Sequence, residues 1–401
     1  MIDLALDASA PASPASTGSV PVWRDDPPLP AEPALLGDTY GYLRPDGQPE
    51  RCERAKLVRK LREEPWTEAV FVPTVAALQE SLELYAPGPG APVRPEDAGL
   101  MEDFRRELRR HAIRDAVLIG TATLAAGVFA AILFPEDGIR TLPGFLTTFL
   151  GAVFLLSLHE IHRARRSDAG IFARARQAKR HEVWADALPI PFTRTLVVVL
   201  GILYVLTGHA ESAVAGAGLV KPAVWDGEVW RMLTGPMLHG SFYHVWMNLT
   251  ALSAVGRLVE RHSSRSHFGV VFLVSVLGGS VLSLLADGRP SVGASGGVLG
   301  LVGFLWMIAR MRPAELPDDF DRRVKYVLGA TALLGILGME FIDNWAHLGG
   351  LLAGAGFGWL VLRGDSDLRG GGWPLRVAGV VAIAVLALAI ACAAVRGSWM
   401  I

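Results

Sequence analysis

Long apolar stretches alternate with short polar connections through most of the chain beyond residue 115. A helix needs about 20 apolar residues to cross the hydrocarbon core of a bilayer. Judged against that length, candidate spans lie at 116–134, 141–158, 190–208, 241–259, 268–286, 293–309, 326–342, 345–362 and 377–395. The pattern predicts an all-α polytopic membrane protein with nine spans.

The chain before the first span divides into two parts of different character. Residues 1–37 are rich in Ala, Pro and Ser, so we expect a disordered tail. Residues 38–112 are charged and repeat apolar residues at helical spacing, which predicts a small cytosolic helical module. We expect a transmembrane hairpin at 113–160 and a basic cytosolic linker at 161–189.

Positive charges fall in alternate connections: before the first span and after the second, fourth, sixth and eighth spans. Because cytoplasmic loops carry an excess of Lys and Arg, we expect a cytosolic N-terminus and an external C-terminus. The content of Ala, Arg and Gly is typical of a bacterial chain and therefore suggests a bacterial cytoplasmic membrane. The starts of the fourth, sixth and eighth spans then lie on the outer side.

Composition excludes several other classes of protein. Hydrophobic residues make up 51% of the 401 residues, which is high for a soluble enzyme. The net charge of −1 argues against a nucleic-acid partner. Cys52 and Cys392 are too few for a disulfide framework or a thiolate metal cluster, so we expect no metal and no cofactor.

Polar side chains gather at the starts of those three outer-facing spans. His239, His244 and Asn248 lie at the fourth span, Ser295 at the sixth and His347 at the eighth. Polar groups inside a membrane are costly, which makes each a candidate for function. A serine hydroxyl becomes a nucleophile when a histidine takes its proton, and an amide or imidazole N–H can stabilise the resulting oxyanion. These residues therefore predict a serine nucleophile with a histidine base.

Glycines surround both members of the predicted pair and allow backbones to approach closely. They are Gly293, Gly296 and Gly297 near the serine, and Gly349, Gly350 and Gly354 near the histidine. A glycine-flanked serine alone is more often a packing residue than a nucleophile. The histidines and the asparagine at the same depth favour catalysis here.

In this combination the sequence resembles the rhomboid family of intramembrane serine proteases. The matching motifs are Trp230-Arg231, H-x4-H-x3-N from His239 to Asn248, G-x3-E from Gly256 to Glu260, G-x-S-G around Ser295, and Ala346-His347 followed by Gly350 and Gly354. The resemblance covers 190–362 and implies a six-span protease core there, with 377–395 as an additional C-terminal span.

The resemblance also implies roles for single residues. Ser295 and His347 would form a catalytic dyad, and the Ser295 N–H, His244 and Asn248 an oxyanion hole. Arg231 and Glu260 would be structural. The supporting residues are His239, Gly293, Gly296 and Trp230. Leu299 occupies a position where the family usually has an aromatic residue.

The expected substrates are membrane proteins whose transmembrane segment contains weak helix formers such as Gly or Pro. Two alternatives remain: a catalytically silent rhomboid-like binder of membrane proteins, and a polytopic transporter. We expect Glu340 and Asp343 to be solvated and Ser280 and Ser283 to serve packing. The connection at 209–240 is expected to lie in the outer leaflet.

Overall fold

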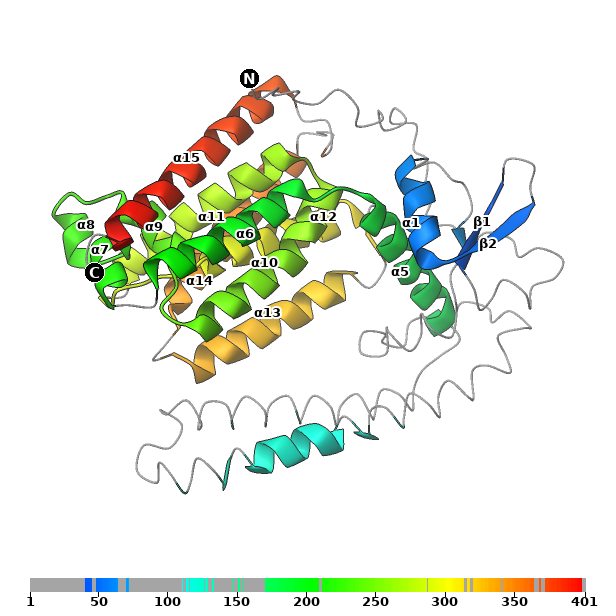
Figure 1. Ribbon diagram of the computed structural model, residues 1–401, viewed down its shortest axis with the longest axis horizontal. Helices are drawn as coiled ribbons and strands as arrows, with labels where there is room; N and C mark the ends of the chain where they lie inside the picture. Colours follow the sequence, from blue (N-terminus) through cyan, green and yellow to red (C-terminus); the bar gives the residue numbers. More distant parts are fainter. Residues whose placement is uncertain are drawn as a thin grey trace.

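A bundle of long helices and a small sheet-containing module make up the described part of the protein (Figure 1). The computed structural model describes residues 40–44, 48–63, 70–71, 116–125, 170–208, 211–286, 288–313, 316–317, 320–339, 342–363 and 372–398, with a few isolated positions between them. The predicted tail at 1–37 and nearly all of the predicted span at 141–158 lie outside these residues. The helical bundle agrees with the predicted polytopic all-α fold.

The bundle helices coincide with predicted spans. They are α6 (Pro191–Thr207), α10 (Phe242–His262), α11 (Arg265–Ala286), α12 (Ser295–Met311), α13 (Phe320–Leu337), α14 (Asn344–Leu362) and α15 (Trp373–Ser398). The largest shift is at α13, which begins and ends several residues before the predicted 326–342. α12 packs most closely against α14 and α11, and α15 lies along the opposite edge of the bundle from α13 (Figure 1).

The lengths of the helices determine which of them can cross a membrane. Within the described residues, α11, α14 and α15 are long and apolar enough, and α6 with the preceding residues Gln177–Ala187 gives a fourth candidate bent by 74°. The apolar α12 has only 17 residues. It rises about 26 Å, less than the hydrocarbon thickness of about 30 Å. By length, α12 is therefore shorter than a full membrane span.

A carboxylate joins the end of α10 to the start of α6. Glu260 accepts hydrogen bonds from the backbone N–H of Phe192 (2.9 Å) and of Thr193 (2.8 Å), and from the Thr193 hydroxyl (2.7 Å). First-turn N–H groups have no partner within their own helix, so Glu260 satisfies two of them. One turn earlier, a Cβ on Gly256 would lie 2.9 Å from Thr193 Cγ2. Gly256 and Glu260 thus hold α6 against α10.

The module before the bundle combines a sheet with one helix. The sheet is antiparallel and has the order β2-β1-β3, with β1 at Tyr40–Leu43, β2 at Pro49–Cys52 and β3 at Val70–Phe71. Helix α1 (Arg54–Glu63) lies between β2 and β3 along the chain. The helix α1 agrees with the helical module predicted for 38–112. The sheet was not predicted. Strands of two to four residues are too short for alternating polarity to reveal them.

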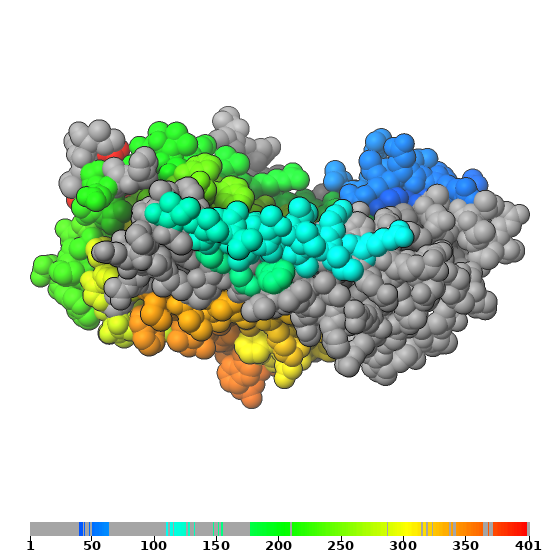
Figure 2. Space-filling model, turned by 90° about the horizontal axis from the view of Figure 1, so that it is seen from below, coloured from blue at the N-terminus to red at the C-terminus, as the bar shows by residue number. Residues whose placement is uncertain are grey.

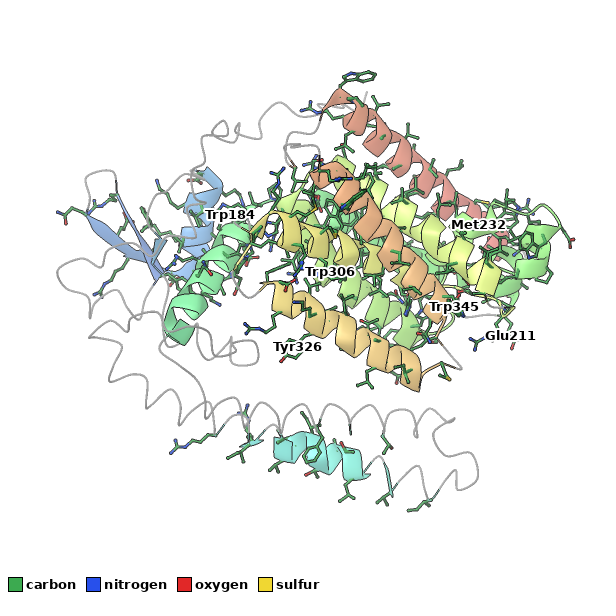
Figure 3. The ribbon with its side chains drawn as sticks, turned by 180° about the vertical axis from the view of Figure 1, so that it is seen from behind. Trp184, Glu211, Met232, Trp306, Tyr326 and Trp345 are labelled. Carbon is green, nitrogen blue, oxygen red and sulfur yellow. The ribbon has the colours of Figure 1, made fainter. Side chains whose placement is uncertain are left out.

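Helix α5 (Gly170–Ala187) connects this module to the bundle, where a linker was expected at 161–189. Its Asp186 carboxylate binds Arg54 of α1 and accepts a 2.7 Å hydrogen bond from Arg261 of α10. Its His181 lies 3.0 Å from His262 of α10, measured between the Nε2 atoms. Figure 3 marks this junction by Trp184. Figure 2 shows the described part of 116–134, in cyan, along one face of the bundle and the blue module at one end.

Candidate active site

Ser295 and His347 meet where two neighbouring helices begin. Ser295 is the first residue of α12, and His347 lies in the first turn of α14. His347 Nε2 lies 2.7 Å from Ser295 Oγ, which is hydrogen-bonding distance. Both residues are partly exposed. The contact that the sequence predicts between these side chains is therefore present, in an orientation that lets the imidazole accept the hydroxyl proton.

The glycines on α12 and α14 allow this contact. A Cβ on Gly350 would lie 2.6 Å from the carbonyl carbon of Gly296, and one on Gly354 would lie 2.6 Å from the Cα of Gly300. Real Cβ atoms essentially never approach within 3.0 Å. Because each helix carries its two glycines four residues apart, the backbones touch over a full turn next to the dyad.

Helix α11 supports α14 from another side in the same way. A Cβ on Gly279 would lie 2.7 Å from the Ala346 carbonyl oxygen, and one on Gly278 would lie 2.6 Å from Ala353 Cβ. Ala346 directly precedes His347, so α11 fixes the backbone that carries the imidazole. Close packing on two sides limits how far His347 can move from Ser295.

Gly293 keeps room for a histidine beside the serine. Its φ of 120° lies in the region that favours glycine. A Cβ there would also lie 2.6 Å from both Cε1 and Nε2 of His244. The imidazole of His244 therefore packs directly against the loop that leads into Ser295.

The predicted oxyanion donors lie on the first turns of α10. Ser241 caps this helix and accepts a hydrogen bond from the His244 N–H at 3.2 Å. Asn248 is buried and donates from Nδ2 to the His244 carbonyl at 2.9 Å. An amide nitrogen carries two N–H groups, so this bond occupies one of them. The Ser295 N–H begins a helix and belongs to the N–H groups that lack an intrahelical partner.

His239 lies behind His244. The ring centroids are 5.2 Å apart in an edge-to-face arrangement, and His239 is 3% exposed. Burial and the neighbouring His244 lower the pKa of His239 to about 3, so its imidazole is neutral at ordinary pH. His239 therefore packs against the His244 ring, which agrees with a supporting place beside the proposed oxyanion donors.

Arg231 organises the connection at 209–240. This connection folds into α7 (Glu211–Ala217), α8 (Lys221–Trp225), α9 (Arg231–Thr234) and the 3-10 helix η4 (Gly235–Met237). Arg231 Nη1 donates to the carbonyls of Ala215 (2.9 Å) and Gly218 (3.0 Å), and the guanidinium lies 4.7 Å from the Trp230 ring centroid. These bonds agree with a structural role for Arg231. Whether the connection enters a leaflet stays a prediction.

Asp343 has a role near the site that the sequence interpretation missed. It caps α14 by accepting a 2.9 Å hydrogen bond from the Ala346 N–H, and its second oxygen accepts from the Ser283 hydroxyl. The buried Lys221 ammonium lies 3.9 Å away. The expectation of a solvated Asp343 is therefore wrong, because its side chain is only 17% exposed. An Asp just before an apolar helix is a known cap signal and marked this position.

Ser280, expected to serve packing only, also hydrogen-bonds: it donates to the Met232 carbonyl at 2.7 Å. Leu299 is buried one turn after Ser295 and belongs to the hydrophobic core of the bundle. Glu340 lies outside the described residues. The region around Ser295 thus combines a polar pair with a tightly packed apolar surround.

Apolar helices that bring together a serine and a histidine define a polytopic membrane protein with a candidate serine-hydrolase centre. Residues 226–364 match the rhomboid domain. Within these residues the chain is a rhomboid domain, and the relatives that it matches are rhomboid proteins. The matched region contains all the predicted site residues and leaves out α6, α15 and the module before the bundle.

Individual relatives differ in what their names say about activity. RHOMBOID-like protein 5 of Arabidopsis thaliana is 32% identical over 36% of this chain and 48% of its own length. Rhomboid protease GluP of Bacillus subtilis (strain 168) is 24% identical over 59% of this chain and 47% of its own length. Inactive RHOMBOID-like protein 8 of A. thaliana is 29% identical over 31% of this chain and 36% of its own length. The chain thus spans about half the length of these relatives or less.

Proposed function

We propose that this protein is an intramembrane serine endopeptidase that cleaves transmembrane segments of other membrane proteins. The observation that supports this most strongly is the 2.7 Å hydrogen bond between His347 Nε2 and Ser295 Oγ. A serine hydroxyl at neutral pH needs such a base to become a nucleophile. The match to relatives that include a named protease agrees with this chemistry.

In the proposed mechanism His347 takes the proton of Ser295 as Oγ attacks the scissile carbonyl. The imidazolium then gives that proton to the leaving amine, and an acyl-enzyme remains. A water molecule, deprotonated by His347, hydrolyses the ester and restores Ser295. A positioned base of this kind contributes about 10²- to 10⁴-fold to the rate. The negative charge of Asp343, at the start of the helix that carries His347, would stabilise the imidazolium.

The oxyanion formed during attack needs donors that are already in place. The Ser295 N–H, the His244 ring and the Asn248 amide are the proposed donors. Their supports are rigid: Gly293 packs against His244, and Asn248 is bonded to the His244 carbonyl. Such preorganisation matters because the donors need not reorient as charge develops.

Substrate must reach the dyad in an unwound form. Peptide bonds inside a helix are shielded by their own hydrogen bonds, so we expect cleavage near Gly, Pro or other weak helix formers. Because α12 is shorter than a full span, Ser295 at its start is well suited to a position just below the membrane surface. Water then reaches the acyl-enzyme from that surface.

The distribution of Lys and Arg supports an orientation in which this end of the bundle faces away from the cytosol. The proposed setting is a cytoplasmic membrane of a bacterial cell, with the N-terminus inside and the C-terminus outside. Fusion of a reporter enzyme to either terminus would test the orientation independently of catalysis.

The test of the function uses purified protein in proteoliposomes with single-span reporter proteins. Wild type should cleave at least one reporter whose span contains Gly or Pro, and Ser295→Ala should leave it intact. If wild type captures reporters without cutting them, the silent-binder alternative replaces the proposal. The name of the inactive plant relative motivates that alternative. Reporter cleavage that persists in Ser295→Ala would contradict Ser295 as the nucleophile.

A further inference from the structure

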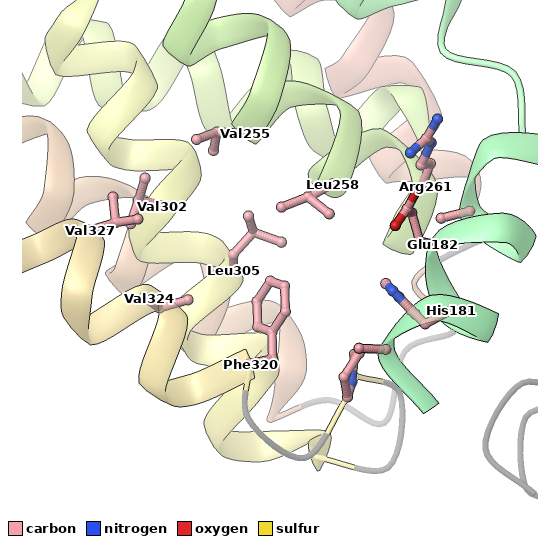
Figure 4. A pocket seen from close by; sticks show the side chains of 13 residues that line it. His181, Glu182, Val255, Leu258, Arg261, Val302, Leu305, Phe320, Val324 and Val327 are labelled. Atoms are coloured by element: carbon pink, nitrogen blue, oxygen red, sulfur yellow. The ribbon is translucent and has the colours of Figure 1, made fainter. Parts of the chain in front are cut away.

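A cavity lies between α5, α10, α12 and α13, at the end of the bundle that carries the C-terminus of α10 (Figure 4). Its volume is about 330 Å³. Aliphatic and aromatic side chains form its walls: Val255, Leu258, Val302, Leu305, Phe320 and Val324. Small-ligand pockets measure about 300–1,000 Å³, so the cavity accommodates part of one acyl chain rather than a whole lipid.

The cavity lies far from the candidate active site. Both regions include residues of α10, with His244 near its start and Arg261 near its end. The 17 residues between them correspond to a rise of about 26 Å. The cavity therefore lies at the other end of α10 from the Ser295–His347 pair, and it does not belong to the proposed catalytic centre.

Three polar side chains, Arg261, His181 and Glu182, also line the cavity, and Arg261 is the one with a permanent positive charge. The Arg261 side chain is 10% exposed, and Nη2 donates to Asp186 at 2.7 Å. Its Nε is buried and has no hydrogen-bond partner among the residues that the structure describes. The guanidinium thus keeps hydrogen-bonding capacity that the described residues do not use, and the small exposed part of its side chain is where a ligand could reach it.

The charges around Arg261 favour an anion. Arg257 and Arg194 lie close enough to repel its positive charge. Glu182 also lines the cavity, but its carboxylate binds Arg54 at 2.9 Å and Lys179 at 3.1 Å. The acidic groups of α5 therefore already have basic partners, and the arginines near Arg261 leave an excess of positive charge.

We propose that this cavity binds one anionic phospholipid. An acyl chain lies between α10 and α13 against Leu258 and Val324, and a phosphate oxygen accepts a hydrogen bond from the Arg261 guanidinium. A lipid is the occupant that fits, because the walls are apolar at membrane depth and the polar group is at the end of a span. Arginine pairs well with phosphate through charge-assisted hydrogen bonds. The site is independent of the proposed proteolysis.

Native mass spectrometry of the delipidated full chain tests this site, with phosphatidylglycerol and phosphatidylcholine as matched probes. Wild type should retain one phosphatidylglycerol and bind it roughly tenfold more tightly than phosphatidylcholine. Both lipids carry the phosphate, but the choline cation of phosphatidylcholine is repelled by the arginines around the cavity mouth. Arg261→Gln should remove that preference. Leu258→Trp, which fills the cavity, should weaken retention of both lipids.

The matched control is Val198→Trp on α6, where Val198 is 57% exposed and lies outside the cavity. It should retain phosphatidylglycerol as wild type does. Thermal unfolding of each variant in detergent shows that the fold is kept. Equal retention of the two lipids by wild type would overturn the proposal. So would an equal loss in Leu258→Trp and Val198→Trp.

Discussion

Gly350→Ala tests whether glycine packing holds the serine and the histidine together. In the native protein the Cβ position at residue 350 lies 2.6 Å from the carbonyl carbon of Gly296, whereas ordinary contact begins at 3.4 Å. A difference of at least about 0.8 Å must come from separation of α12 and α14, because backbone atoms cannot rotate away and the Gly296 carbonyl oxygen is closer still. The added methyl group therefore acts on the distance between the two helices.

The size of the effect follows from that separation. If the whole displacement reaches the dyad, the 2.7 Å distance between His347 Nε2 and Ser295 Oγ grows to about 3.5 Å, the limit of a hydrogen bond. A misplacement of about 1 Å costs roughly 100-fold in rate. Overpacking also destabilises a core by about 1–3 kcal/mol. We expect Gly350→Ala to lower cleavage at least about 30-fold and to lower the unfolding temperature.

The assay measures reporter cleavage in proteoliposomes and thermal unfolding in detergent for the same preparations. Gly356→Ala is the matched control, because Gly356 is on α14 but a Cβ there would meet no atom of the described residues within 4 Å. Alanine favours a helix over glycine by about 1 kcal/mol, so this control should be neutral or slightly stabilised. Wild-type cleavage by Gly350→Ala would refute the packing argument. An equal loss of activity in the two variants would also refute it.

Three further variants test other parts of the site. Asn248→Ala should lower turnover about 10²- to 10³-fold with little change in unfolding temperature, since one oxyanion donor is lost; unchanged turnover removes Asn248 from the site. Asp343→Ala should lower both stability, by about 1 kcal/mol from the lost cap, and turnover. Asp343→Asn keeps the cap and should restore the stability alone, whereas equal turnover in wild type and both variants would exclude an influence of Asp343 on His347. Glu260→Ala should destabilise the protein by about 1–3 kcal/mol because it leaves backbone N–H groups at the start of α6 without a hydrogen-bond acceptor. An unchanged thermal unfolding curve would contradict this structural role of Glu260.

The bundle was predictable because its pattern is local. Apolar runs and their glycines mark helices and close packing without any knowledge of long-range contacts, and the Ser295–His347 contact followed from glycines on both helices. The ends of α12 and α13 differ from those of the predicted spans because hydropathy does not mark helix ends. Caps such as Asp343 do so.

Other features could not be predicted from the hydrophobic pattern, because they depend on contacts between residues far apart in the sequence or on very short elements. Lys221 and Asp343 approach one another only in the folded protein, where α8 and the start of α14 meet. The residues around each position in the sequence do not indicate that the two side chains interact. The short strands at residues 40–71 carry too few residues for a periodic signal. Asp186 and the pair His181–His262 join α5 to α10. In the sequence these residues lie within charged connections, and nothing there indicates that they contact one another.

The central claim is that Ser295 is a nucleophile activated by His347. The most direct measurement treats the purified protein with a fluorophosphonate and locates the adduct by peptide mass spectrometry. The account predicts one adduct on Ser295, a strong reduction in His347→Ala and none in Ser295→Ala. An adduct on a different serine, or undiminished labelling in Ser295→Ala, would contradict it.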